Sequence, residues 1–224
     1  MKLDSLLGVD ALDKPYAAKQ GTEKTGGKRV RGASTARSAA AHFNRGEQFR
    51  RKGLLRSAAQ AYRKAVEFAP DNAHYRFRLS ECYAGIGLTE EAIVELERAR
   101  DLKPEESYYH FSLGNLYVRA GRIEEAIASL QKATHFAPRD AYYNVRLGVL
   151  CLRFRYLHEA ADALRRAIKL DPENASYHAL LGDVYAGLGY DREALRHYRN
   201  AGRLDPYDAR YVEQVRRMVA GDMT

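Results

Sequence analysis

The residues best suited to chemistry in this sequence are its histidines, which serve enzymes as bases, nucleophiles and metal ligands. The sequence contains seven of them: His42, His74, His110, His135, His158, His178 and His197. His42, His110 and His178 follow one another at a constant interval of 68 residues, which indicates sequence repetition and not a catalytic cluster. The sequence also lacks HExxH, GxSxG and phosphate-binding P-loop motifs. We therefore expect no enzymatic activity, no metal site and no cofactor.

The two cysteines, Cys82 and Cys151, each lie in an apolar helical stretch without a second cysteine nearby. Metal sites and redox motifs need clustered ligands, so we expect two buried, reduced thiols. No apolar run approaches the roughly 18 residues of a membrane span. The first residues, MKLDSLLGVDALDKPY, are interrupted by aspartates and do not resemble a secretory signal. These features together predict a cytoplasmic protein with no membrane span.

Composition sets broad limits on the class of partner. Apolar residues make up 46% of the chain and charged residues 29%, so most of the chain can fold and stay in solution. The formal net charge is +8. A surplus of this size is compatible with acidic proteins, nucleic acid or anionic lipid as partners, but it selects none of them.

The spacing of the prolines indicates which elements position these residues, because five of the six prolines recur every 34 residues. They are Pro70, Pro104, Pro138, Pro172 and Pro206. Alanines precede each proline by five residues and by twelve, and a large residue stands between the two alanines. The large residues are Tyr62, Leu96, Leu130, Leu164 and Tyr198. A periodicity of this length is typical of a tandem-repeat fold.

Further positions of the repeat indicate a pair of helices in each unit. Small residues recur 24 positions before the proline, at Gly46, Ser80, Gly114, Gly148 and Gly182. Glycines recur 17 positions before it, and Arg155 is the single departure. Proline ends one helix, and a mid-repeat glycine with positive φ ends the other. Side chains that can cap a helix follow each proline: Asn72, Ser107, Asp140, Asn174 and Asp208.

This array resembles the tetratricopeptide repeat family over five full repeats. The repeats are 39–72, 73–106, 107–140, 141–174 and 175–208. Repeat three matches the family pattern most fully, at Leu113, Gly114, Tyr117, Ala126, Leu130, Ala133 and Pro138. The family's frequent tryptophan near the start of the first helix is absent. Its place is taken by His42, Arg76, His110, Asn144 and His178, and His110 is expected to have a structural role.

The resemblance implies an all-α fold, a right-handed solenoid of antiparallel helix pairs in which each repeat packs mainly on its neighbours. Residues 209–224 follow the last repeat. Tyr211, Val212, Val215 and Val219 have helical spacing there, which predicts a C-terminal capping helix over residues 209–219.

The resemblance also implies that the first helix of each repeat, helix A, lines an inner concave groove. Repeat positions 2, 5, 6, 9 and 13 then supply its side chains, which in the middle repeats are aromatic and basic. The candidate partner-binding residues are Phe77, Arg78, Tyr108, Phe111, Asn115, Arg119, Tyr142, Arg146 and Arg153. Such a groove suits a peptide or short helix with apolar anchors and acidic residues. The alternative is that Phe77 and Phe111 belong to the core between repeats and that the arginines form a solvated face.

Residues 1–38 differ in composition, and we expect a disordered basic tail there. The stretch KQGTEKTGGKRVRGAST is too polar to bury a core. Within the tail, residues 3–12 carry leucines and a valine spaced as in a short amphipathic docking segment, and a ragged terminus is the alternative. The basic residues at 28–31 could attract phosphates but lack interleaved aromatic rings.

Two functions follow from these features. The first is a non-catalytic scaffold or adaptor that binds protein partners in its groove. The alternative is a nucleic-acid-associated factor that uses the basic tail and the first repeat, with the solenoid as a docking platform. The identity of the partner and the oligomeric state stay open at this level.

Overall fold

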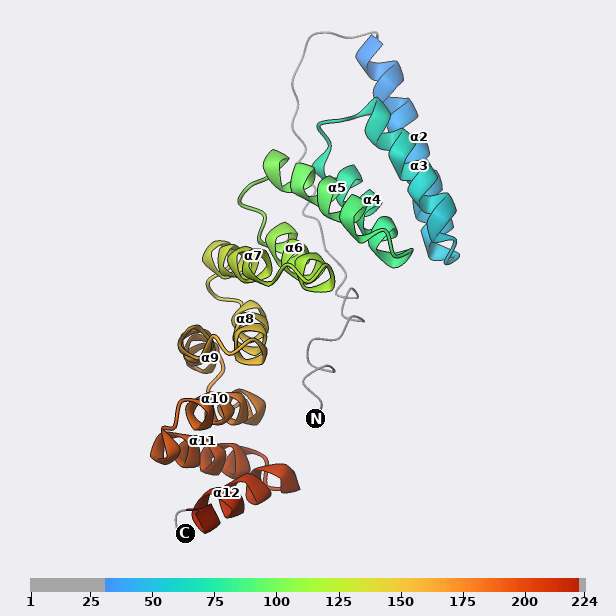
Figure 1. Cartoon of the computed structure of the whole chain (residues 1–224). Helices are drawn as coiled ribbons and strands as arrows, with labels where there is room; N and C mark the ends of the chain where they lie inside the picture. The colour runs from blue at the N-terminus through green and yellow to red at the C-terminus, as the bar shows by residue number, and fades with distance from the viewer. Residues whose placement is uncertain (1–30, 222–224) are drawn as a thin grey trace. The chain divides into compact units, whose positions relative to one another are not determined.

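The structure is a computed structural model that describes residues 31–221. Within that range the chain forms eleven α-helices and no strand (Figure 1). The helices are α2 (Arg31–Arg51), α3 (Leu55–Phe68), α4 (Ala73–Gly85), α5 (Thr89–Leu102), α6 (Ser107–Arg119), α7 (Ile123–Phe136), α8 (Ala141–Arg153), α9 (Leu157–Leu170), α10 (Ala175–Gly187), α11 (Asp191–Leu204) and α12 (Ala209–Gly221). The docking segment predicted at 3–12 lies outside the described residues.

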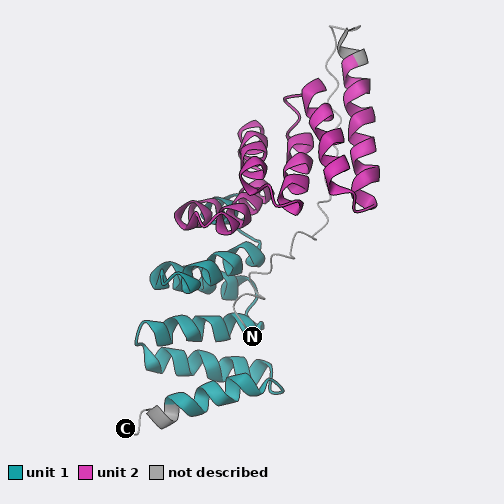
Figure 2. Cartoon of the chain, turned by 45° about the vertical axis from the view of Figure 1, so that its right-hand side comes forward, with its two compact units in different colours: residues 1–11, 130–224 teal, residues 12–129 magenta. Residues whose placement is uncertain are grey.

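The described residues form two compact units, 31–129 and 130–221, and the boundary falls inside α7 (Figure 2). In the first unit α2 packs on α3, α3 on α4, α4 on α5 and α5 on α6. In the second unit α8 packs on α9, α9 on α10, α10 on α11 and α11 on α12. In these pairs, helices that follow each other in sequence are therefore neighbours in space. The predicted all-α fold of antiparallel helix pairs is confirmed.

Helix A begins at the first residue of each predicted repeat from the second onward. These helix starts are Ala73, Ser107, Ala141 and Ala175, and α12 likewise begins at Ala209. The first repeat differs, since α2 begins at Arg31 and not at residue 39. The predicted tail of residues 1–38 therefore ends in a helical segment. The reason is the alanine content of residues 33–41, because alanine has the highest helix propensity.

The turn between the two helices of each repeat has one backbone geometry throughout. Gly53, Gly87, Gly121 and Gly189 have φ between +72° and +85°, and Arg155 has φ +64° at the matching position. The next residue donates its backbone N–H to the carbonyl five residues earlier, as in Arg122 N to Tyr117 O at 2.8 Å and Tyr156 N to Cys151 O at 2.9 Å. This is the Schellman termination of a helix, which requires the left-handed conformation.

Capping at the start of helix A varies more than the sequence predicted. Asn72 Oδ1 accepts from Tyr75 N at 3.1 Å, and Asp140 Oδ1 accepts from Tyr142 N at 2.9 Å. Ser107 is not a cap, because it is the first helical residue of α6 and Glu106 occupies the cap position. Asn174 occupies a cap position but makes no capping bond, since its amide donates to Asp171 Oδ2 at 3.2 Å.

The repeated alanines and the large residue between them form the core. All ten alanines are fully buried, with 0% exposure: Ala58, Ala65, Ala92, Ala99, Ala126, Ala133, Ala160, Ala167, Ala194 and Ala201. The large residues between them are at most 3% exposed. Side chains of this small size let the two helix backbones of a repeat approach closely, so burial of the apolar stripe supplies most of the stability of each pair.

The small residue on helix A is needed because the large residue of helix B lies directly against it. A Cβ added at Gly148 would lie 2.7 Å from Leu164 Cγ, and one at Gly182 would lie 2.7 Å from Tyr198 Cε1. Repeat two has serine at this position, and Ser80 Oγ donates to the buried carbonyl of Ala92 at 2.7 Å. The sequence pattern of small residue opposite large residue is thus a packing requirement.

Candidate functional site

Three of the predicted groove residues lie together on α6, in the unit of residues 31–129. Tyr108, Asn115 and Arg119 occupy repeat positions 2, 9 and 13, so one helix face carries all three. Tyr108 and Asn115 are half-buried, and Arg119 is exposed. Arg119 Nη2 donates to the carbonyl of Ala84 at 2.8 Å, near the C-terminal end of α4. A guanidinium is favourable at a helix C-terminus, so this bond ties α6 to α4 and fixes the position of the arginine.

The two phenylalanines predicted to line the groove are buried instead. Phe77 is 2% exposed and Phe111 4% exposed. Phe77 stacks on Tyr109 with ring centroids 5.4 Å apart and meets Tyr108 edge-on at 5.4 Å. Tyr108 also lies beside Phe111, with a centroid distance of 6.2 Å. Both phenylalanines therefore belong to the core that supports Tyr108, which is the alternative that the sequence left open.

Arg78 is neutralised within the molecule, so it does not make the surface basic as predicted. Its Nη1 donates to Glu81 Oε2 at 2.7 Å, and its Nε lies 3.5 Å from Glu47 Oε1. Glu47 also accepts from Tyr62 OH at 2.5 Å and from Arg50 Nη2 at 2.9 Å. Burial would raise the pKa of Glu47, but the hydrogen bonds from Arg50 and Tyr62 hold it below its ordinary value. The result is a structural network in which carboxylates balance the guanidinium groups.

The remaining predicted residues lie on α8, in the unit of residues 130–221. Arg146 is buried, at 6% exposure, and burial lowers the pKa of its guanidinium. Arg153 is exposed at the end of α8, where its guanidinium carbon lies 5.7 Å from the centre of the Phe154 ring. Tyr142 is half-buried. These three residues share one helix, but only Tyr142 and Arg153 present accessible side chains.

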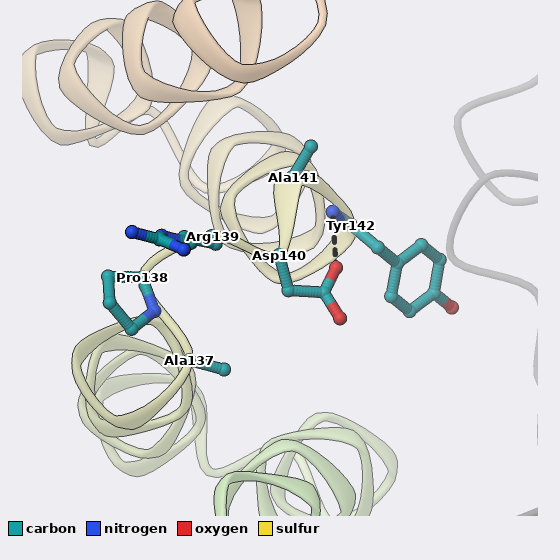
Figure 3. Close-up of a pocket in the computed structure, with 6 residues that line it drawn as sticks. All are labelled: Ala137, Pro138, Arg139, Asp140, Ala141 and Tyr142. Atoms are coloured by element: carbon teal, nitrogen blue, oxygen red, sulfur yellow. Dashed lines mark hydrogen bonds between the residues drawn. The ribbon is translucent and has the colours of Figure 1, made fainter.

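A shallow pocket of about 540 Å³ lies at the start of α8 and is lined by residues 137–142. Figure 3 shows the Asp140 carboxylate facing the backbone N–H of Tyr142, whereas the side chains of Arg139 and Tyr142 extend in opposite directions. The carboxylate is therefore engaged as a helix cap, and the arginine does not converge on it. Among these six lining residues, no nucleophile and base are paired, so the pocket has no catalytic arrangement.

Three of the five polar residues that replace the family's tryptophan bond to the turn between repeats, a contact that the sequence analysis did not identify. His110 Nε2 lies 2.7 Å from the carbonyl oxygen of Pro104, and Arg76 Nε donates to that of Pro70 at 2.8 Å. His178 Nε2 makes the matching contact with the carbonyl oxygen of Pro172, at 3.1 Å. The structure thus gives His110 the expected structural role. A sequence signal was present, because each of these donors stands six residues after a proline.

His178 and His197 form a buried pair with a definite protonation pattern. Their Nδ1 atoms are 3.2 Å apart, and the rings are stacked with centroids 5.4 Å apart. A carbonyl oxygen can only accept, so His178 donates from Nε2 to Pro172 and its Nδ1 accepts from His197 Nδ1. Burial, and to a lesser degree the facing His178, lower the pKa of His197 to about 4. His197 is therefore neutral at neutral pH, and its contact with His178 joins α10 to α11.

Other chemistry-bearing groups in the described part of the chain do not gather into a site. Cys82 and Cys151 are buried free thiols, as predicted, and burial raises the pKa of each to about 12. Within residues 31–221 no group of three potential ligands could hold a metal ion. No helix in the same range is long and apolar enough to cross a membrane.

Comparison with known proteins places the chain among repeat proteins. The family model described as "Cilia and flagella-associated protein 70 C-terminal domain" matches residues 4–223. No curated protein matches the sequence. Two solved structures are similar over most of their lengths. One is MamA, with 24% identity, a TM-score of 0.70, and coverage of 78% of this chain and 95% of that chain. The other is YrrB, described as a TPR protein with an unusual peptide-binding site, with 20% identity, a TM-score of 0.68, and coverage of 83% and 97%.

Proposed function

Because the chain belongs to the family of the cilia and flagella-associated protein 70 C-terminal domain, a tetratricopeptide repeat family, we propose that it is a non-catalytic protein-binding scaffold. Its helix-A surface would receive a peptide or helix of a partner protein. The fold and the family support protein interaction as the general role. The particular surface and the chemistry of the ligand are our inference from the side chains on α6 and α8.

The observation that carries this proposal is the α6 face formed by Tyr108, Asn115 and Arg119. An aromatic ring, an amide and a guanidinium follow one another along one side of a single helix. An asparagine amide can bond both the N–H and the C=O of an extended peptide. Arginine pairs with carboxylates in a bidentate manner. Packing against Phe77 and Phe111 fixes Tyr108, so the surface is organised before a ligand arrives.

The expected ligand is more polar than the sequence suggested. Phe77 and Phe111 are buried and Arg78 is neutralised, so only Tyr108 is left on this face as an aromatic contact for an apolar anchor. Arg119 and, in the other unit, Arg153 are exposed cations on helix A. We therefore expect a partner segment with acidic residues and one apolar anchor. The description of YrrB as having a peptide-binding site agrees with this use of the fold.

A cytoplasmic location belongs to the same proposal. It is supported by the two free, buried thiols, since cytoplasmic proteins keep cysteines reduced. The nucleic-acid alternative rests on the basic tail, of which residues 1–30 lie outside the described range, and on the first repeat, and it enters here as an outcome of the experiment.

The proposal is tested by affinity capture from a nuclease-treated native lysate, followed by quantitative mass spectrometry. Three variants of the full chain carry the same change of formal charge. Asn115→Asp/Arg119→Glu alters the α6 face, and Gln131→Glu/Lys132→Glu alters exposed residues of α7. Lys28→Gln/Arg29→Gln/Arg31→Gln alters the basic stretch before and at the start of α2. Circular dichroism confirms that each variant keeps its helix content.

Proteins that are captured by the wild type and by the α7 variant, but lost with the α6 variant, would establish the α6 face as the binding surface. Capture that is unchanged in the α6 variant would contradict the proposal. The same capture is also run from untreated lysate, and proteins whose capture there depends on the basic stretch and is lost after nuclease treatment would favour the nucleic-acid alternative.

A further inference from the structure

Helix α11 carries four arginines on one exposed face. Arg192, Arg196, Arg199 and Arg203 are spaced by four, three and four residues, which places them in one line along the helix. All four are exposed. The opposite face contains Ala194, His197, Tyr198 and Ala201, which are buried. We refer to the four arginines as the arginine stripe.

The fold does not require arginine at these positions. They are positions 18, 22, 25 and 29 of the repeat, and in repeat two the same positions hold Glu90, Val94, Glu97 and Asp101. Repeat three has Glu124, Ala128, Gln131 and His135 there. A helix-B surface that accepts acidic, apolar and neutral residues elsewhere is therefore uniformly cationic in repeat five.

The arginine stripe has no compensation within the described residues. None of its four side chains forms an ion pair or hydrogen bond with another residue between 35 and 218. Some exposed arginines on other helices are paired with a carboxylate: Arg98 pairs with Glu95 at 2.8 Å and Arg217 with Glu213 at 3.0 Å. Like charges three and four residues apart destabilise a helix. The stripe thus has a cost in the isolated molecule that an acidic partner would remove.

The composition of the surface favours a protein partner. All four cations are arginines, although the chain uses lysine at other exposed helix positions such as Lys132 and Lys169. Arginine suits planar, bidentate recognition of a carboxylate or phosphate, which a general attraction to anions does not need. Arginine is enriched at the centres of protein interfaces, whereas lysine is depleted there.

The spacing of the four arginines also indicates the secondary structure of the partner. Along the helix axis, the Cα atoms of successive arginines are about 6 Å apart where the interval is four residues and about 4.5 Å apart where it is three. Carboxylates on another α-helix at the same four- and three-residue intervals have the same axial spacing. We propose that the arginine stripe of α11 is a second interaction surface, separate from the α6 face, that docks an acidic α-helix of a partner protein.

The test measures binding of a synthetic helix to the full chain. The probe is a fluorescein-labelled, alanine-based peptide of about 18 residues with four glutamates at the intervals of the stripe. A second peptide replaces the glutamates with glutamine. The stripe variant is Arg196→Gln/Arg199→Gln, and the matched control is Arg165→Gln/Arg166→Gln, which removes two exposed charges from α9. Fluorescence anisotropy is recorded at low salt and at about 0.15 M salt.

We expect the glutamate peptide to bind the wild type and the α9 control alike, and to bind the stripe variant at least about tenfold more weakly. The glutamine peptide should not bind. In a charge-swap cycle, Arg196→Glu/Arg199→Glu should bind a peptide that carries lysines at the same four positions. Circular dichroism should show unchanged helix content, because glutamine is a good helix former.

Equal binding of the glutamate peptide to the stripe variant and the α9 control would overturn the proposal. Equal binding of the glutamate and glutamine peptides would overturn it as well. The same titration is repeated with a single-stranded DNA oligonucleotide and with phosphatidylserine vesicles. If either of these binds in a stripe-dependent manner while the glutamate peptide does not, the stripe recognises phosphate and the protein-partner assignment is wrong.

Discussion

At the scale of single residues, Arg155 is unusual in its backbone. It is the one residue other than glycine with positive φ among residues 31–221, and it stands where four of the five repeats have glycine. The Schellman turn needs the left-handed conformation whatever the residue type. For an L-residue with a Cβ, the left-handed conformation costs about 1–2 kcal/mol. The packing of the repeat therefore imposes the turn geometry and holds the backbone of Arg155 in the left-handed conformation despite its side chain.

Replacement of Arg155 by glycine should stabilise the protein by about 0.5–1 kcal/mol, because the strain is relieved while the turn is retained. Gly121→Ala should have the opposite effect, a loss of about 1 kcal/mol. A Cβ at Gly121 would meet no atom within 4 Å, so its cost arises from the backbone alone. Thermal unfolding should show melting temperatures shifted by roughly 2–4 °C in opposite directions. A decrease for Arg155→Gly would show that its side chain makes a larger contribution than the strain.

The His178–His197 pair makes stability depend on pH. The pKa of His197 is about 4 in the folded chain, against an ordinary value of 6.5. Since the folded state resists protonation, the contribution of this residue is fully present above pH 6.5 and is lost as the pH falls from 6.5 toward 4. The expected loss is about 2 kcal/mol at pH 5. Burial raises the pKa values of Glu81 and Asp183, and these two carboxyls oppose the loss.

The contribution of the pair is isolated by comparison with His197→Asn, which keeps a donor near Nδ1. The free energy of unfolding is measured with urea at pH 7.5 and at pH 5. Its decrease between these two pH values should be about 2 kcal/mol smaller in this variant than in the wild type. An NMR titration of the wild type should show no protonation of His197 between pH 7 and pH 5. Identical pH dependence in the two proteins would contradict the assignment.

At the scale of helices, each pair is held by the contact of the small residue on helix A with the large residue on helix B. In repeats one and five the large residue is tyrosine, and its hydroxyl donates to a carboxylate on helix A. Tyr62 bonds Glu47 at 2.5 Å and Tyr198 bonds Asp183 at 2.7 Å. Repeats two to four have leucine at this position and need no such acceptor. The terminal repeats thus add a polar link to the packing that all five share.

Gly148→Ala should destabilise the protein by about 1–3 kcal/mol, although alanine is the better helix former. The reason is that its Cβ would lie 2.7 Å from Leu164 Cγ. Leu164→Ala alone should cost about 2–5 kcal/mol through the cavity that it leaves. The double variant should cost less than the sum of the two, by about 1–2 kcal/mol, because the new methyl group enters that cavity. Urea unfolding of all four proteins gives the coupling directly, and strict additivity would show that the two residues do not compete for space.

Much of the helical architecture could be predicted because the signals repeat. Five prolines at one interval located the starts of helix A in repeats two to five and of α12, since proline acts on the local backbone alone. The start of α2 at Arg31 could not be located in this way. Its first residues precede the first recurring position, and only their alanine content indicates helix. The exchange of glycine for Arg155 shows the same limit, because the turn persists without its sequence signal.

At the scale of the whole molecule, the candidate site was less predictable than the fold. Helical periodicity placed Tyr108, Asn115 and Arg119 on one face, which is a property of one helix. Whether Phe77 is covered, or Arg78 neutralised, depends on residues of other helices, Tyr109 and Glu47 among them. A list of residue types at repeat positions does not contain that information. The predicted aromatic and basic residues are therefore divided: Phe77, Phe111 and Arg146 are buried, Arg78 is paired with carboxylates, and Arg119 and Arg153 are exposed.

The two proposed interaction surfaces differ in chemistry and lie on different helices. Helix A presents an aromatic ring, an amide and a single cation on α6, and helix B presents the arginine stripe on α11. In the proposed scaffold, partners bound at these two sets of residues would not compete for the same side chains. Binding at the stripe should weaken steeply with salt, whereas binding at α6 should be less sensitive to it.

The most direct test of the central claim is site-specific photo-crosslinking. A benzophenone amino acid is placed in the full chain at position 115 on α6, and in a second protein at position 132 on the exposed face of α7. We predict that irradiation in native lysate joins a protein partner to the first and not to the second, and that Arg119→Glu abolishes the product. Equal crosslinking from both positions, or crosslinking from position 132 alone, would show that helix A is not the binding surface.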